Sequence, residues 1–273
     1  MQDLTLGLSY LLGGVCLYAC AVHATVGLRR PRDLVQIAFA GLCLATACLG
    51  VSSAHVAKAV DPGVYLANLR WSVTFGVMTY FCQMWFVALY TGIKPKPFLY
   101  GLSAIYLVAV LVNAFGQQTI QFETLQSFNP KRMAWGETIA IGTGIPSMWF
   151  KLGSFALLLT HVFMLYASFA HYRAKHSSQS WAILVAVVIA ALGTLQGMLV
   201  RFGAIEFIQL GPFAFLGLVV VMSLAMNQES LDQRRRFELD QKAMLENDLA
   251  GLFKLDCDRI VWSNLAFLRM VGY

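Results

Sequence analysis

Seven apolar runs, each long enough to cross a lipid bilayer, occupy most of this chain of 273 residues. An α-helix rises 1.5 Å per residue, so about 20 apolar residues span the roughly 30 Å of hydrocarbon in a membrane. A hydrophobic share of 58% and a charged share of 12% are also unlike those of a water-soluble domain. We therefore predict an all-α membrane protein, a seven-helix transmembrane bundle. The predicted spans are Leu4–Leu28, Leu34–Ala57, Ala67–Tyr90, Phe98–Phe115, Met148–Ala170, Trp181–Phe202 and Glu206–Met226.

Basic residues are concentrated in alternate connections between these spans. Arg29, Arg30 and Arg32 follow the first span, Lys94 and Lys96 the third, Arg173 and Lys175 the fifth, and Arg234, Arg235 and Arg236 the seventh. The other connections hold Lys58, Lys131 and Arg132. Because Lys and Arg accumulate on the cytoplasmic side of a membrane, we predict an N-terminus outside and a C-terminus in the cytoplasm. This pattern also accounts for the formal charge of +6, so we expect no nucleic-acid partner.

One connection, Gly116–Ser147, is much longer than the others. Apolar and polar residues alternate around Ile120 and Phe122 and again around Ile139 and Ile141, while Asn129, Pro130 and Gly136 supply turn residues between them. Long loops without structure are uncommon in compact domains. We predict an extracellular hairpin or lid, with a mobile loop as the alternative.

The seventh run continues into a charged helix, because no Pro occurs from Phe213 to Asp248 and Gly217 is the only Gly in that stretch. We divide the chain into a transmembrane domain (1–226), a cytoplasmic signalling helix (227–248) and a C-terminal segment (249–273). Leu231, Glu238 and Leu245 repeat every seven residues, which favours a parallel coiled coil and a homodimer over a solitary amphipathic helix. In the sixth span Gly193 and Gly197 predict close helix packing, either inside the bundle or at a dimer seam.

Polar and ionisable side chains near the outer ends of the spans are the candidate ligand-binding residues. They are His55, Arg70, Asn113, Gln196, Arg201 and Glu206. Because such groups are costly in a bilayer, we expect them to converge on one outward-facing pocket that binds a small molecule beneath the lid. The alternative is that Arg70, Arg201 and Glu206 reach membrane lipid headgroups or pair with one another.

Other chemistry finds little support in the residue pattern. His161 lies deeper, near Gln83, where a hydrogen-bonded packing role is commoner than a metal or haem ligand. The cysteines within the spans do not have the spacing of metal ligands, and the long loop contains no pair of cysteines. We therefore expect neither a metal site nor a disulfide framework. No buried lysine lies in the seventh span for retinal. We expect no cofactor and no catalytic residues in this chain.

The C-terminal segment has a strand, turn, strand and helix pattern from Gly251 to Met270. Its marker residues are Gly251, Phe253, Asp256, Asp258, Ile260, Val261, Asn264, Phe267, Met270, Gly272 and Tyr273. This string resembles the opening of a PAS domain, an α/β fold. Two short strands and one helical turn cannot bury a core, so we expect the chain to be part of a longer protein.

Seven spans, a helical linker and a PAS start together resemble the N-terminal sensor region of bacterial histidine kinases and related diguanylate cyclases. The local likeness is strongest at Trp85–Gly92. The resemblance implies a receptor in the bacterial inner membrane whose output enzyme follows Tyr273. A histidine kinase of a two-component system is the first expectation, a diguanylate cyclase the second and a transporter the third. An inverted pair of broken helices, typical of transporters, is not evident in the runs.

Overall fold

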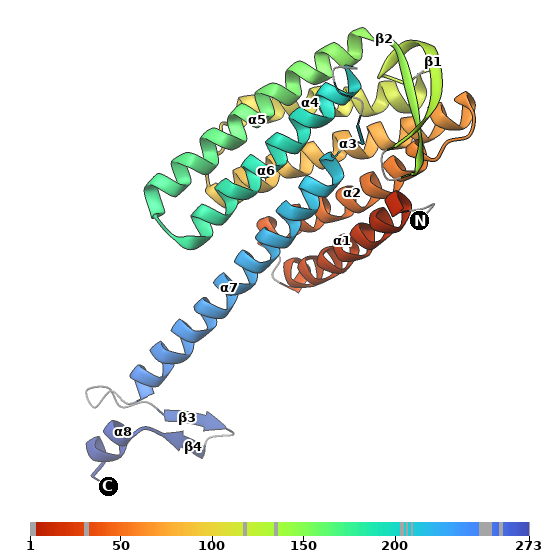
Figure 1. Ribbon diagram of the computed structural model, residues 1–273. Coiled ribbons are helices and arrows are strands. Elements are labelled where there is room, and N and C mark those ends of the chain that lie inside the picture. Colours follow the sequence, from red (N-terminus) through yellow and green to blue (C-terminus); the bar gives the residue numbers. More distant parts are fainter. Residues whose placement is uncertain are drawn as a thin grey trace. The chain divides into compact units, whose positions relative to one another are not determined.

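The computed structural model describes residues 4–29, 33–116, 119–133, 136–202, 205, 207–208, 210–245, 253–256 and 259–272 (Figure 1). The chain divides into two compact units, Met1–Ser223 and Leu224–Tyr273. The first unit is a bundle of long helices with a β-hairpin at one end. The second contains the remainder of the last long helix, two short strands and a short helix.

Within the described residues, seven helices are long and apolar enough to cross a membrane. This confirms the predicted number of long apolar helices and is consistent with a multi-pass membrane protein. The helices are α1 (Leu4–Arg29), α2 (Leu34–Ala57), α3 (Pro62–Thr91), α4 (Lys96–Phe115), α5 (Met148–Lys175), α6 (Ser178–Arg201) and α7 (Gly211–Leu245). Consecutive helices of the bundle run in opposite directions (Figure 1). We call the end at which α1, α3, α5 and α7 begin the hairpin end.

The two helix starts that differ most from the predicted spans are those of α3 and α7, and local helix-start chemistry explains both. Asp61 Oδ1 accepts the N–H of Val64 at 2.9 Å, and Pro62 occupies the first turn, so α3 begins at Pro62 instead of Ala67. The described residues between 205 and 210 are not helical, and α7 begins at Gly211 with Pro212 in its first turn instead of at Glu206. The start of α3 precedes its predicted apolar run, and the start of α7 lies inside its predicted run. Hydrophobicity alone therefore does not reveal either start.

The helix α7 is continuous from Gly211 to Leu245. This confirms the predicted uninterrupted helix, which begins in an apolar stretch and ends in a charged one. Its residues are mostly good helix formers, and Pro212 is tolerated because the first turn of a helix lacks intrahelical N–H partners.

The long connection between α4 and α5 forms an antiparallel β-hairpin, as predicted. Its strands are β1 (Phe122–Arg132) and β2 (Thr138–Pro146), and Gly136 in the turn has φ = 88°. The predicted turn at Asn129 and Pro130 is wrong, because these residues pair with Ile141 and Ala140 within the strands. Both strands of a two-stranded sheet are edge strands, so a proline that lacks an N–H donor is tolerated there.

The hairpin packs on α3 and α4 through a buried apolar cluster. Ile120 and Phe122 contribute from the hairpin side, and Tyr65, Leu69 and Val73 contribute from α3. The close approach depends on glycine at position 142, since a Cβ there would lie 2.6 Å from the Tyr65 ring. The hairpin therefore covers one end of the bundle.

The buried carboxylate of Glu137 holds the hairpin against the bundle. The Glu137 side chain is 0% exposed and lies 2.8 Å from Lys58 Nζ. It also accepts hydrogen bonds from the Thr5 hydroxyl at 2.6 Å and from the Thr5 N–H at 3.2 Å. The N–H groups of a first helical turn have no intrahelical partner, and the helix dipole favours an anion there. Glu137 therefore joins the hairpin to the start of α1 and to the turn between α2 and α3.

In the second unit, β3 (Phe253–Asp256) pairs antiparallel with β4 (Arg259–Ser263), and α8 (Leu265–Met270) follows. Asn264 caps α8 by accepting the N–H of Phe267 at 3.0 Å. The predicted order of strand, strand and helix is confirmed. The turn is predicted at Cys257, Asp258 and Arg259; the first two lie outside the described part of the chain, and Arg259 is instead the first residue of β4.

We predict that Glu137→Gln loosens the hairpin. The substitution keeps the shape of the side chain but removes the charge that faces Lys58 and the α1 N-terminus, so stability should fall by about 1.5–3 kcal/mol, as for hydrogen bonds to charged groups. Thermal unfolding and the rate of limited proteolysis within the hairpin would measure this. Glu123→Gln, which changes an exposed carboxylate of β1, is the matched control. Equal effects of the two substitutions would contradict the prediction.

Candidate ligand site

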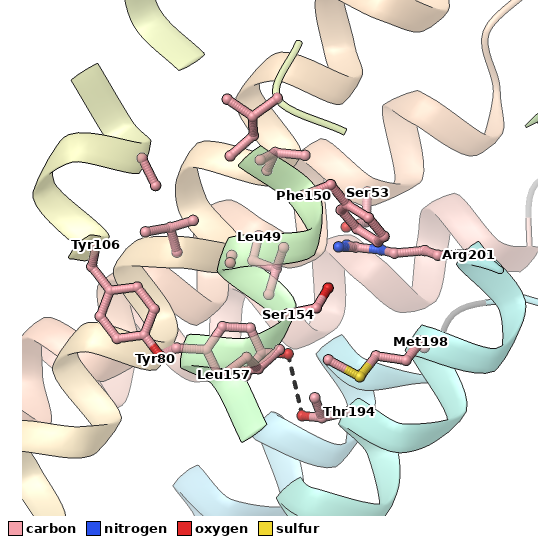
Figure 2. A pocket seen from close by; sticks show the side chains of 18 of the residues that line it. Leu49, Ser53, Tyr80, Tyr106, Phe150, Ser154, Leu157, Thr194, Met198 and Arg201 are labelled. Atoms are coloured by element: carbon pink, nitrogen blue, oxygen red, sulfur yellow. Dashed lines mark hydrogen bonds between the residues drawn. The ribbon is translucent and has the colours of Figure 1, made fainter. Parts of the chain in front are cut away.

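Two neighbouring cavities lie at the hairpin end of the bundle. The first, of about 100 Å³, is bounded by α2 to α7 and has a largely apolar and aromatic lining. Figure 2 shows Leu49, Tyr80, Tyr106, Phe150 and Leu157 of this lining, which also includes Phe215. We call it the inner cavity. The second, the hairpin cavity, has about 110 Å³ and is lined by residues of α1, α2, α3, β2, α6 and α7. Ser53, Arg201 and Pro212 line both cavities.

Arg201 is the last residue of α6, and its side chain lines the inner cavity and extends towards Ser53 and Phe150 (Figure 2). It is the only charged side chain among the described residues that line these two cavities. A guanidinium group binds carboxylate and phosphate oxygens through two parallel N–H donors. The arrangement therefore places a cation at one edge of an apolar space.

The walls of the inner cavity are built from aromatic residues whose polar ends are hydrogen-bonded. The Tyr80 hydroxyl lies 3.2 Å from the Thr194 hydroxyl, and the Tyr106 hydroxyl lies 2.6 Å from that of Thr160. The Tyr80 ring also packs edge-on against Phe215 of α7, with ring centroids 5.4 Å apart. These contacts join the α7 wall of the cavity to α3 and α6.

The two glycines of α6 have different roles. A Cβ at Gly193 would lie 2.3 Å from Cβ of Ala214, so this glycine lets α7 approach α6 inside the bundle. The packing interpretation is thereby confirmed for Gly193. Among the described residues, a Cβ at Gly197 would meet no heavy atom within 4 Å beyond the neighbouring part of α6, and Gly197 lines the inner cavity. Its missing side chain therefore contributes to the open space.

Four of the other predicted site residues have structural partners elsewhere. Gln196 donates to the Ile208 carbonyl at 2.8 Å and accepts the Leu210 N–H at 2.9 Å, which holds the segment before α7. His55 is exposed, and its Nε2 lies 3.3 Å from the Tyr10 hydroxyl.

Arg70 and Asn113 lie together at the contact between α3 and α4. Asn113 donates to the Arg70 carbonyl at 2.8 Å, and Arg70 Nη2 donates to the Gly116 carbonyl at 2.9 Å. Arg70 lines a different cavity from Arg201, bounded by α3, α4 and β1. Glu206, the sixth predicted residue, lies outside the described residues.

At the opposite end of the bundle, a buried histidine joins three helices. His23 of α1 is 1% exposed, and its Nδ1 lies 2.6 Å from Gln36 Oε1 of α2. Because that oxygen only accepts, Nδ1 donates, and in the neutral ring Nε2 accepts from the Ser223 hydroxyl of α7 at 2.9 Å. Sequence reasoning missed His23 and Glu137. A His and a Gln at matching depths of adjacent spans was the available indication for His23.

His161 is buried, as expected for a packing role, with Nδ1 2.9 Å from the Leu157 carbonyl and its ring edge-on to Tyr80. Among the described residues, no group of three or more His, Cys, Asp or Glu side chains is placed to hold a metal ion.

No family model and no curated protein matches the chain. The functional argument therefore rests on the cavities, their charges and the helices that form them.

We predict opposite effects for the two glycines of α6. Gly197→Ala should raise stability by about 0.5–1 kcal/mol, because alanine is the better helix former and the new methyl group enters open space. Gly193→Ala should lower stability, because its methyl group collides with Ala214. Thermal unfolding midpoints of both variants in one detergent test the pair. Shifts in the same direction would show that the cavity at Gly197 is misplaced.

Proposed function

We propose that this chain is the signal-receiving part of a bacterial membrane signalling protein. A small molecule that combines an anionic group with a short apolar body binds in the inner cavity, with the anion at Arg201. Binding alters the packing of α7, and α7 conveys the change to the cytoplasmic end of the chain.

The observation that carries this proposal is the position of α7. Its first residues, Gly211, Pro212 and Phe215, line the inner cavity, and the same helix continues without interruption to Leu245. A ligand that fits one packing of these residues better than another would shift the population of the whole helix. A preference of a few kcal/mol is enough for such a shift.

The dimensions and the charge of the site indicate the kind of ligand. A cavity of about 150 Å³ holds benzene, and the inner cavity has about 100 Å³. The apolar part of the ligand should therefore have a smaller volume than benzene, as in a short-chain carboxylate such as butyrate. Arg201 binds the carboxylate, and the apolar chain lies among Leu49, Leu157 and Phe215.

The contact at His23 supports a relay to the other end of the bundle. Ser223 of α7 is bonded to His23, and His23 is bonded to Gln36, so a shift of α7 must change or break this chain of hydrogen bonds. A buried polar group left without a partner is unfavourable by about 1–3 kcal/mol, so two discrete arrangements are favoured over intermediate ones.

The basic residues and the C-terminal segment support a proposed location and a proposed output. We propose a bacterial inner membrane with the hairpin end outside, in keeping with the positive residues of the alternate loops. The order β3, β4 and α8, with Asn264 capping α8, supports a PAS start. A histidine kinase is the proposed output, and a diguanylate cyclase is the alternative. A kinase would show a phospho-acceptor histidine and an ATP-binding region in the parent sequence.

We also propose a parallel homodimer joined by the charged part of α7. Leu231 belongs to the heptad series Leu231, Glu238 and Leu245, and Phe237 flanks that series; both are large apolar residues that are exposed in the single chain. Their burial against a second copy would stabilise a two-helix contact, as in a coiled coil.

Binding of butyrate tests the ligand site. With the purified chain, butyrate should raise the thermal unfolding midpoint more than butanol, since a ligand stabilises the state it binds and butanol lacks the charge. Arg201→Gln should weaken butyrate binding by about 1.5–3 kcal/mol, roughly 10–100-fold. Gly197→Leu should block binding by filling the cavity.

Lys151→Gln is the control for charge, because Lys151 is an exposed cation at the same end and lines neither cavity. If carboxylates from acetate to hexanoate stabilise the native chain and the Arg201→Gln variant equally, Arg201 is not the anchor. If none of them stabilises the native chain, the ligand class is wrong.

Disulfide crosslinking of a Leu231→Cys variant tests the dimer and the relay. The native cysteines of this variant are first replaced by alanine. We expect crosslinks between chains in native membranes, at a rate that butyrate changes. With His23→Phe, butyrate should still bind, but its effect on the crosslinking rate should be lost. Absence of crosslinks would refute the parallel dimer, and an unaltered butyrate effect in His23→Phe would refute the relay.

A further inference from the structure

A third cavity, of about 650 Å³, lies where α3, α4 and β1 meet, and the proposed ligand site does not include it. Its polar lining comes from Arg70, Thr74, Thr119 and Thr124, and most of the remaining lining is apolar. This volume is within the range of about 300–1,000 Å³ that is usual for ligand pockets.

Two polar groups point to the chemistry of the occupant. The Arg70 guanidinium donates to the Gly116 carbonyl at the end of α4, and with five N–H donors a guanidinium can bind an anion at the same time. The Thr119 hydroxyl is buried and has no hydrogen-bond partner among the described residues. Buried polar groups are nearly always hydrogen-bonded, so this hydroxyl is available for a partner from outside the described residues.

The surroundings of the cavity are those of a membrane boundary. Trp71, which lines the cavity, is 60% exposed and stacks on Phe75 with an interplanar angle of 22°. Phe115, next to the lining residue Ala114, is 84% exposed. Aromatic residues are enriched where lipid headgroups meet the hydrocarbon, and cationic side chains near helix ends reach the same level.

We infer that this cavity binds the phosphate group of a membrane phospholipid. Arg70 pairs with the phosphate, the Thr119 hydroxyl donates to one of its oxygens, and the acyl chains leave past Trp71. The inference rests on the membrane placement proposed above and is independent of the ligand at Arg201. It assigns the two arginines to different anions, Arg70 to a structural lipid and Arg201 to the signal molecule.

Lipid binding to the full chain, measured by native mass spectrometry with dioleoyl phosphatidylglycerol as the probe, tests this site. Arg70→Gln should weaken binding of the first lipid about tenfold or more, because it removes a charged hydrogen bond. Thr119→Val should weaken it by a smaller factor. Lys151→Gln, which removes an exposed charge at the same end of the bundle, should leave it unchanged. Dioleoylglycerol, which lacks the phosphate, and glycerol 3-phosphate, which lacks the acyl chains, should not displace the lipid.

Binding of the first lipid within twofold of the native value in both Arg70→Gln and Thr119→Val would overturn the site. Displacement by glycerol 3-phosphate would overturn the lipid assignment in favour of a soluble phosphate. If Arg70→Gln does not fold, Thr119→Val decides, since the Thr119 hydroxyl has no partner within the described chain to lose.

Discussion

The buried carboxylate of Glu137 is the interaction on which the organisation of the hairpin end depends. A carboxylate without solvent is tolerated only where charges and N–H donors surround it, and here Lys58 and the first turn of α1 do so. The contacts tie the β1–β2 hairpin to helices that lie far from it in sequence. With the hairpin held against Tyr65, the hairpin cavity acquires its β2 wall, and Arg201 lies between this cavity and the inner one.

The same bundle places its polar groups in two separate layers. At the hairpin end, Arg201 and the tyrosine and threonine hydroxyls border a small apolar space. At the other end, His23, Gln36 and Ser223 form a chain of hydrogen bonds that includes α7. Both α2 and α7 line the inner cavity and take part in the His23 contacts, and α7 then continues beyond the bundle. In the proposed receptor, this helix couples cavity occupancy to the output.

The sequence was informative where one physical quantity dominated. Length and apolarity determine a membrane-crossing helix, so α2 has the predicted bounds Leu34–Ala57. Where a local rule competed with a tertiary one, prediction was poorer. Asn129 and Pro130 are good turn residues, yet they lie in β1 because edge strands accept them.

The site was predicted only in part, because counting along helices gives depth but not direction. Arg70 and Arg201 were both placed near the hairpin end, but Arg70 lines the cavity beside β1 and Arg201 lines the two inside the bundle. Asn113 and Gln196 hold the backbone of neighbouring segments. The burial of Glu137 depends on Thr5 and Lys58, which are distant in sequence, and no local pattern reveals it. The apolar runs thus do not show how each helix is rotated about its axis.

The central claim, that the covered cavities face outside while α7 leads into the cytoplasm, is tested most directly by labelling single cysteines in intact cells. Glu123→Cys in the hairpin and Ser178→Cys at the start of α6 are exposed positions at opposite ends of the bundle. The six native cysteines would first be replaced by alanine. The account predicts that a membrane-impermeant maleimide labels Glu123→Cys in intact cells and Ser178→Cys only after lysis. Labelling of Ser178→Cys in intact cells, with Glu123→Cys protected until lysis, would contradict it.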